Sequence, residues 1–350
     1  MNRVDRVRTA AGGDAVLVTS LPHVRWACGF SGSNALMLVT ADAAVLFTDG
    51  RYTEQADRET DDSVTVAIGS DLVAELASAP SAHALTSLVV DGAHLTVDRH
   101  RKLSEALDAS LDIRTGFLDA EVAVKDEIEI DALRRAQAIT CDVFDSIVPT
   151  IGPGVSEQEL AAEIVYQHMR RGASAMAFEP IVASGPHGAL PHARPSSRTF
   201  RPGDMVVIDM GGIVDGYCAD MTRTVAIGTP DADILDAYRA VEEAVQAGYN
   251  TVRAGVSGAE LDRAARAALD VHGLSEYFTH SLGHGVGMQV HEWPRLSRQV
   301  DHTVPSGACI TFEPGVYVPG RFGIRTEDLV VVRDEGAESL TPMSRDLVVV

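Results

Sequence analysis

Short apolar runs and helical patterns alternate along the first third of the chain. Five runs rich in Val, Leu and Ala are bounded by turn-forming residues, which is typical of short strands. The predicted strands are residues 15–20, 35–40, 44–49, 63–69 and 87–92. Residues 71–79 and 97–109 instead read as helices. This alternation predicts a small α/β domain.

A longer amphipathic pattern marks the start of a second domain. Residues 126–148 carry apolar side chains near one helical face, among them Ile130, Leu133 and Val143. A length of 350 residues exceeds one typical domain. We therefore expect two domains, residues 1–121 and residues 122–350.

The second domain contains a faint internal duplication. The segment GVSEQEL at residues 154–160 recurs as GVSGAEL at residues 255–261. In both, Ser is followed three residues later by Glu, a capping box that predicts a helix start. A loop, an apolar strand and two acids follow each helix. We interpret the repeat as two related half-domains that face each other across a shared site, within an α/β (α+β) fold.

Four acids hold matching positions in the two halves. They are Asp209 and Asp220 in the first half, and Glu313 and Glu327 in the second. In each half, the first acid ends an apolar strand and the second stands in or beside another strand. The Asp215-Gly216 pair predicts a hairpin turn, which would bring Asp209 and Asp220 roughly opposite each other.

Buried carboxylates destabilise a fold unless cations compensate them. Four carboxylates balance two divalent cations, and a neutral His284 would complete the ligand shell. This oxygen-rich set suits a hard ion such as Mn²⁺, and two ions about 3.5–4 Å apart form a hydrolytic clamp. We expect the glycines around His284 to let the backbone approach metal and substrate, and His291 to act on substrate. The alternative is four separate surface or salt-bridged acids.

Composition and charge exclude several classes of partner. Acidic residues number 50 and basic residues 29, which gives a net charge of −21. Such a surface repels phosphate backbones and anionic lipid, so we expect neither nucleic acid nor a membrane as partner. Asp5 and Asp14 interrupt any signal-like apolar core. Four scattered cysteines fit a reducing cytoplasm.

These residues resemble the pita-bread metallopeptidases, the family of methionine aminopeptidase, aminopeptidase P and prolidase. That family orders its metal ligands Asp, Asp, His, Glu, Glu. The matching residues are Asp209, Asp220, His284, Glu313 and Glu327. The resemblance implies a pita-bread catalytic domain with an internal pseudo-two-fold duplication. It also implies two divalent metal ions, with Mn²⁺ first and Co²⁺ or Zn²⁺ as alternatives.

Further motifs resemble the proline-specific branch of this family. Residues 184–197 resemble its substrate-histidine segment, and residues 29–34 and 46–56 resemble a creatinase-type N-terminal domain. The resemblance implies that Glu313 is both ligand and proton shuttle, and that His291 and His192 hold the carbonyl and the oxyanion. The implied substrate-binding residues are His192, His280, His291 and Arg325.

Some side chains near these motifs keep two interpretations. Arg325 would support the metal-site acids or a substrate carboxylate, and His280 would line the pocket or pack in the core. We assign Tyr217 and Tyr317 to packing. His187 stands where the resemblance leads us to expect Asn, and we predict an exposed loop histidine.

The implied activity is cleavage between an N-terminal residue and a following proline, by a cytoplasmic homodimer acting as an Xaa-Pro aminopeptidase. An Xaa-Pro dipeptidase (prolidase) is the alternative, because the two differ in whether the far side of the pocket is blocked. A catalytically dead peptide-binding module would be expected to lose ligands, and this chain keeps all five. A nucleic-acid-binding relative would need a basic face.

Overall fold

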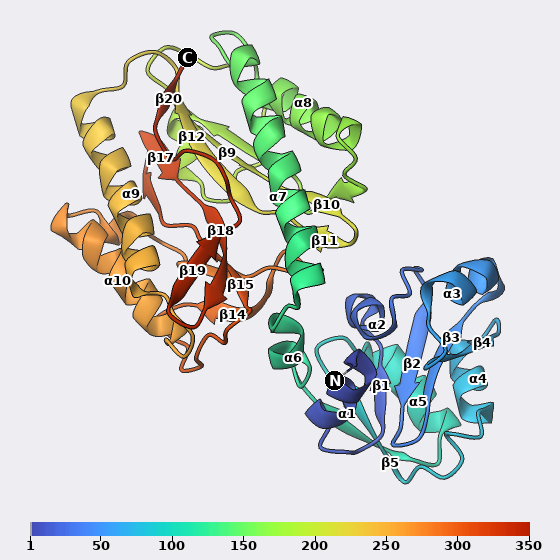
Figure 1. Cartoon of the computed structure of the whole chain (residues 1–350). Helices are drawn as coiled ribbons and strands as arrows, with labels where there is room; N and C mark the ends of the chain where they lie inside the picture. The colour runs from blue at the N-terminus through green and yellow to red at the C-terminus, as the bar shows by residue number, and fades with distance from the viewer. Residues whose placement is uncertain (1) are drawn as a thin grey trace. The chain divides into compact units, whose positions relative to one another are not determined.

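The apolar runs of the first third pair into one mixed six-stranded sheet in the computed structural model, which describes residues 2–350 (Figure 1). The chain divides into two compact units, the first running to Val122 and the second Ala123–Val350. The sheet of the first unit has the order β4-β3-β2-β1-β5-β6. Its strands are β1 (Val16–Val18), β2 (Ala35–Val39), β3 (Ala44–Thr48), β4 (Thr65–Ile68), β5 (Ser87–Asp91) and β6 (Ser110–Arg114).

All five predicted strands of this unit form. The sequence pattern missed β6, because its residues SLDIR alternate poorly and none is fully buried. The helices are α1 (Arg3–Ala10), α2 (Leu21–Cys28), α3 (Thr53–Glu59), α4 (Leu72–Ser78), α5 (Val97–Ala106) and α6 (Asp119–Ala123), with a 3₁₀ turn η1 (Gly50–Tyr52). Leu36, Phe47 and Leu88 are fully buried in the core.

The second unit begins with the predicted long helix, α7 (Glu127–Ile147), which Asp126 opens with a complete capping box. Its other helices are α8 (Glu157–Arg170), α9 (Ala232–Thr251) and α10 (Gly258–Val271). Three 3₁₀ turns are η2 (Val148–Thr150), η3 (Gly185–Ala189) and η4 (Ser275–Tyr277).

Each half of this unit contributes one larger sheet. The first sheet has the order β20-β12-β9-β8, with β8 (Ile181–Ser184), β9 (Met205–Met210), β12 (Met221–Ala226) and β20 (Val348–Val349). The second has the order β14-β13-β15-β18-β19, with β13 (Gly283–Gly285), β14 (Glu292–Leu296), β15 (Cys309–Phe312), β18 (Asp328–Arg333) and β19 (Gly336–Ser339). Smaller sheets join β7 (Ala175–Met176), β10 (Gly212–Val214) and β11 (Tyr217–Cys218), and pair β16 (Gly315–Val318) with β17 (Phe322–Arg325).

The two halves repeat the same local arrangement. Ser156 caps α8 and Ser257 caps α10, each accepting from the backbone N–H three residues later. Both serines also form an isolated antiparallel bridge, with Thr199 in the first half and Thr303 in the second. A long helix precedes and packs against each capped helix, α7 on α8 and α9 on α10. This correspondence supports the duplication inferred from the sequence.

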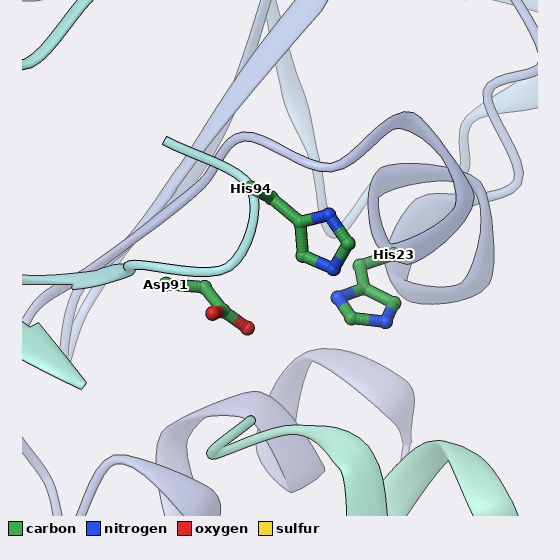
Figure 2. A group of neighbouring side chains, drawn as sticks. All are labelled: His23, Asp91 and His94. Atoms are coloured by element: carbon green, nitrogen blue, oxygen red, sulfur yellow. The ribbon is translucent and has the colours of Figure 1, made fainter. Parts of the chain in front are cut away.

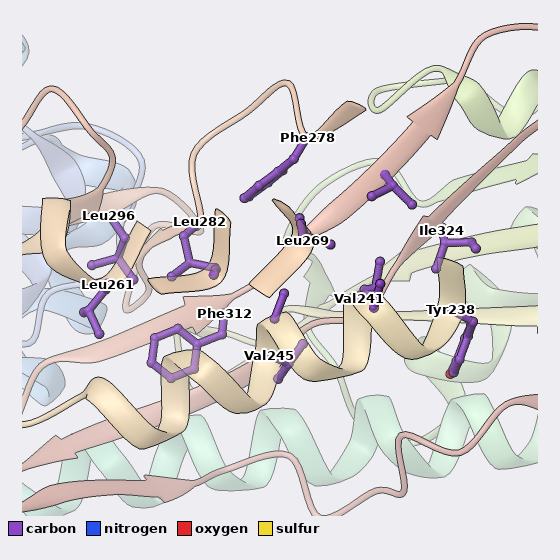
Figure 3. Close-up of a cluster of buried hydrophobic side chains, with 14 of the residues drawn as sticks. Tyr238, Val241, Val245, Leu261, Leu269, Phe278, Leu282, Leu296, Phe312 and Ile324 are labelled. Carbon is purple, nitrogen blue, oxygen red and sulfur yellow. The ribbon is translucent and has the colours of Figure 1, made fainter. Parts of the chain in front are cut away.

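The largest apolar cluster packs the helices and strands of the second half against one another. Figure 3 shows side chains of α9 and α10 packed against the strands, with Phe312 of β15 in contact distance of the helix layer. Val241, Val245 and Leu269 are fully buried in it. Gly248 of α9 allows this approach, because a Cβ there would lie 3.2 Å from the Phe312 ring. The cluster therefore sets the position of the strand that leads into Glu313.

We predict that Leu269→Ala destabilises the catalytic unit by about 2–5 kcal/mol, because it opens a cavity in this cluster. Leu269 is fully buried, whereas Val271 two residues later on α10 is 82% exposed. Val271→Ala is the matched control, with an expected change within about 0.5 kcal/mol. Urea unfolding measures both. Equal effects of the two variants would contradict the packing described here.

Candidate metal and catalytic site

The first pair of acids stands on one hairpin. Strands β9 and β12 pair antiparallel with Asp209 opposite Thr222, and Asp220 directly precedes β12. Asp215 and Gly216 turn the chain between β10 and β11, with φ of 51° and 87°. Such positive φ values suit a two-residue hairpin turn. The two acids are thus offset by two residues along the pair.

The second pair of acids stands at one end of the other large sheet. Strands β15 and β18 pair antiparallel with Phe312 opposite Asp328. Glu313 follows β15 and Glu327 precedes β18, so both carboxylates emerge at the same edge. His284 lies on β13, whose Gly285 pairs with Ile310 of β15. All three side chains come from adjacent strands.

The glycines beside His284 serve strand packing, and the expectation that they also let the backbone approach metal and substrate stays a prediction. A Cβ at Gly283 would overlap the backbone carbonyl of Thr311 on β15. One at Gly285 would overlap the carbonyl of Trp293 on β14. The small residues therefore let β13 fit between its two neighbours, and this fit holds the His284 backbone in place.

The tautomer of His284 follows from its contacts. Its Nδ1 lies 3.1 Å from the Gly285 carbonyl oxygen, which can only accept, so Nδ1 carries the proton. Burial, aided by His291, lowers the pKa of His284 to about 3, and the ring is neutral at pH 7. The bare Nε2 lies 3.4 Å from Glu313 Oε1 and 3.6 Å from Asp220 Oδ2. Three atoms that can each bind a metal ion thus face one another.

Burial raises the pKa values of the carboxyl groups around this point. The pKa of Glu327 rises to about 8 through burial and then the charge of Asp209. Burial and the charge of Glu327 raise the pKa values of Asp220 and Glu313 well above their ordinary range. The common cause is desolvation of charges that also repel one another. A cation at their centre would reverse this effect.

Arg325 is a buried, permanent positive charge of the site. Its side chain is buried, and one Nη2–H donates to Asp209 Oδ2 at 2.6 Å. The Nε–H donates to Thr222 Oγ1, and Nη1 donates to the Tyr317 hydroxyl and the Pro191 carbonyl. Nearly all its donors are engaged by the protein. This favours support of the acids over direct contact with a substrate carboxylate.

Tyr317 and His280 extend this network, and our assignment of Tyr317 to packing was wrong. The His280 Nδ1 donates to the Ser281 carbonyl at 2.9 Å, and burial lowers the pKa of His280 to about 3. Its neutral Nε2 therefore accepts from the Tyr317 hydroxyl at 2.9 Å. That hydroxyl in turn accepts from Arg325. The sequence offered one signal for this role. Tyr317 stands two residues after Gly315, the first residue of β16, and alternate residues of a strand share a face.

Tyr217 and His187, whose roles the sequence analysis also predicted, each have a specific partner. The Tyr217 hydroxyl donates to Glu129 at 2.8 Å within a buried cluster, in keeping with a packing role. His187 is not an exposed loop residue, because its Nδ1 lies 2.8 Å from the buried carboxylate of Glu157. Glu157 also accepts from Ser184 and Ser196. We call these contacts of Glu157 the His187–Glu157 clamp. They hold both ends of the loop that carries His192.

A cavity of about 440 Å³ brings most of the predicted residues together. Asp209, Asp220, His284 and Glu313 line it, and so do His192, His280, His291 and Arg325. Glu327 lies behind this wall, where it accepts from Thr222 Oγ1 at 2.7 Å. The His291 ring stands edge-on to His284, with ring centroids 4.4 Å apart. Phe178, Pro180, Ile181 and Pro191 give the cavity an apolar side.

The sequence profile of metallopeptidase family M24 matches residues 131–334, and that of the creatinase/prolidase N-terminal domain matches residues 1–120. The chain belongs to metallopeptidase family M24. This confirms the predicted resemblance to proline-specific pita-bread metallopeptidases, the fold class, and the prediction of a metallo-exopeptidase. Family membership implies divalent metal ions.

Similar proteins match this family member over nearly its whole length. A structure described as an Xaa-Pro dipeptidase from Bacillus anthracis is 34% identical, covers 99% of both chains and has a TM-score of 0.96. An X-Pro aminopeptidase from Thermotoga maritima is 35% identical over 100% of both chains, with a TM-score of 0.92. A curated Xaa-Pro dipeptidase from Pyrococcus horikoshii is 32% identical over 96% of this chain and 94% of its own.

The residues of this M24 chain fit such ions. Acceptor atoms of Asp220, His284 and Glu327 all lie within 4.8 Å of one another. Asp209 Oδ1 is buried and accepts no hydrogen bond from the described residues. An oxygen-rich donor set with one neutral imidazole suits a hard or borderline divalent ion. Residues 2–350 include no helix long and apolar enough to cross a membrane.

We predict that the metal-free protein loses stability as pH rises from about 5 to 8. The folded-state pKa of Glu327 is about 8, above its unfolded value, so the folded state holds extra protons in this window. Deprotonation as pH rises therefore favours unfolding. Glu327→Gln removes the charge and should flatten the dependence. Melting temperatures in a chelator measure this, and a parent protein that gains stability over the same range would contradict it.

Proposed function

We propose that this chain hydrolyses peptide bonds between an N-terminal residue and proline, with two divalent ions held by Asp209, Asp220, His284, Glu313 and Glu327. The observation that carries the proposal is that four of these residues line a cavity that also presents His192 and His291, with Glu327 directly behind them. The printed names of the similar proteins support the substrate class.

The bound ions would activate water and polarise the scissile carbonyl. The chain's own side chains do the rest. Glu313 borders the cavity beside the His284 Nε2, where it can take a proton from the attacking water and deliver it to the leaving imino nitrogen. His291 and His192 donate to the carbonyl and the oxyanion that develops from it. The bond before proline lacks an N–H, so recognition falls to groups such as these and to the apolar wall.

We infer Mn²⁺ as the resident ion because four of the five donors are carboxylates, with Co²⁺ or Zn²⁺ as alternatives. The homodimer and the cytoplasmic location remain predictions. All five proposed ligands belong to one chain.

The cationic side chain of Arg295 supports an Xaa-Pro dipeptidase. The sequence alone favoured an Xaa-Pro aminopeptidase. Arg295 is exposed and lines the cavity, and it forms no ion pair within residues 2–350. Burial and then the positive charge of Arg295 lower the pKa of His291, which supports their proximity. A guanidinium binds carboxylates well. A dipeptide offers a carboxylate directly after proline, whereas a longer peptide offers a neutral amide there.

We predict that Asp220→Ala lowers the metal content and reduces kcat by more than about 100-fold, since loss of supporting groups outside the ligand shell already costs 10–100-fold. Asp236→Ala is the control, because it removes one exposed acid from α9 without touching the site. Elemental analysis after Mn²⁺ loading and turnover of an Xaa-Pro dipeptide measure both. Full turnover by the thoroughly demetallated parent would overturn the two-metal proposal.

His291→Ala and His192→Ala should each lower kcat by about 10²–10³-fold while metal content stays unchanged, because each removes one donor to the transition state. His272→Ala, on a histidine that contacts Glu243 outside the cavity lining, is the matched control. Concurrent loss of metal would instead identify the altered histidine as a ligand.

Arg295→Ala should raise KM for an Xaa-Pro dipeptide by about 10-fold or more, in line with loss of a charged hydrogen bond worth about 1.5–3 kcal/mol. Hydrolysis of Xaa-Pro-Yaa-Zaa should change little. The two substrates are compared on the same preparations. Equal losses on both would reject the dipeptide preference and leave the Xaa-Pro aminopeptidase as the better description, with the metal site unaffected.

A further inference from the structure

The first unit contains a second cluster of metal-ligating side chains, made of His23, Asp91 and His94. Asp91 is the last residue of β5, His94 lies in the turn that follows, and His23 lies on α2. Figure 2 shows the Asp91 carboxylate directed toward the two imidazoles, which present ring nitrogens to each other. The rings meet edge to face, with centroids 5.2 Å apart.

The Asp91 carboxylate is buried without full compensation. It is 4% exposed. Its Oδ1 accepts from the backbone N–H of Ala93 at 2.9 Å and of Gly116 at 3.4 Å. Its Oδ2 accepts no hydrogen bond, and Asp91 forms no ion pair with Lys or Arg in the described part of the chain. A buried anionic oxygen without a partner destabilises the fold unless a cation meets it.

A catalytic-triad type of hydrogen bonding does not account for the cluster. Among residues 2–350, no imidazole nitrogen donates a hydrogen bond to the Asp91 Oδ2. One ligand atom from each of the three residues nevertheless lies within 4.8 Å of the other two. Ligands at about 2.0–2.2 Å from a tetrahedral Zn²⁺ lie about 3.3–3.6 Å apart. To bind an ion, these side chains would rotate so that their ligand atoms move closer together.

The backbone around the cluster fixes the ligands. The His94 N–H donates to the Asp91 carbonyl at 3.2 Å, which closes the turn. The Thr19 hydroxyl donates to the His94 carbonyl at 3.4 Å and ties this turn to the segment before α2. His23 is itself only 4% exposed on α2. Such support is expected where ligand orientation matters.

We propose that His23, Asp91 and His94 bind one divalent ion of borderline softness, with Zn²⁺ as the best match, independently of the catalytic site. Two imidazoles and one carboxylate are the donor set of open zinc sites, whose fourth position takes water or another ligand. This differs from the carboxylate-dominated set of the second unit. The cluster thus selects for a different metal than the Mn²⁺ proposed there.

Zinc binding by the full chain tests the proposal, with Asp220→Ala in all proteins to weaken the catalytic site. The demetallated protein is dialysed against Zn²⁺ alone, and bound zinc is counted by elemental analysis. We expect His94→Ala to remove one equivalent per chain. His83→Ala, on an exposed histidine of the same unit, should remove none. Unchanged zinc binding in His94→Ala would overturn the proposal.

A second variant distinguishes loss of the zinc site from misfolding of the unit. Asp91→Asn keeps an acceptor for the Ala93 N–H, so its fold should persist by circular dichroism, and its zinc count should fall by the same one equivalent. With Co²⁺ in place of Zn²⁺, the visible absorption of a low-coordinate site should appear in the Asp220→Ala protein and vanish in both cluster variants. Persistence of that absorption in either folded variant would contradict the site. In the background without Asp220→Ala, Mn²⁺-dependent peptidase activity of His94→Ala should equal that of the parent.

Discussion

Electrostatic compensation around Asp209 governs the architecture of the catalytic unit. Four carboxylates share a desolvated corner, and the pKa values of Asp220, Glu313 and Glu327 rise because their charges lack water and meet their neighbours. The buried Arg325 offsets one of them through a 2.6 Å ion pair with Asp209. One fixed cation cannot balance four anions, so without a metal Asp220, Glu313 and Glu327 hold protons at pH values where free carboxyl groups are ionised. This unbalanced negative charge supports the proposal that the corner binds divalent ions.

The duplicated fold supplies this corner from both halves at once. Asp209 and Asp220 come from the β9–β12 hairpin, while His284, Glu313 and Glu327 come from β13, β15 and β18. Cross-links join the halves at the same point: Arg325 donates to Asp209, and Thr222 donates to Glu327. The apolar cluster under α9 and α10 positions the strands without entering the cavity. Polar contacts therefore align the halves locally, and apolar packing holds them there.

The sequence predicted much of this, and its omissions have physical causes. Apolar runs and capping serines locate strands and helices because burial and local hydrogen bonds act within a few residues. The acids were recognisable because their order repeats. Tyr317 and the His187–Glu157 clamp were missed because their partners lie 8 to 37 and 30 residues away. The role of Gly283 and Gly285 depends on neighbouring strands, which no local pattern reveals. The His23, Asp91 and His94 cluster joins a helix to a turn about 70 residues later and shows no motif spacing.

The long separation between Asp209 and Arg325 also bears on how the chain is made. These partners stand 116 residues apart. At translation rates of about 5–20 residues per second, Asp209 leaves the ribosome roughly 6–23 s before its counter-charge. During that interval the nascent β9–β12 hairpin carries acids that nothing in the chain neutralises. The first half-domain therefore presents only Asp209 and Asp220 of the proposed ligands while the second is still being synthesised. The proposed metal site is therefore completed only after the second half has been synthesised and has met the first.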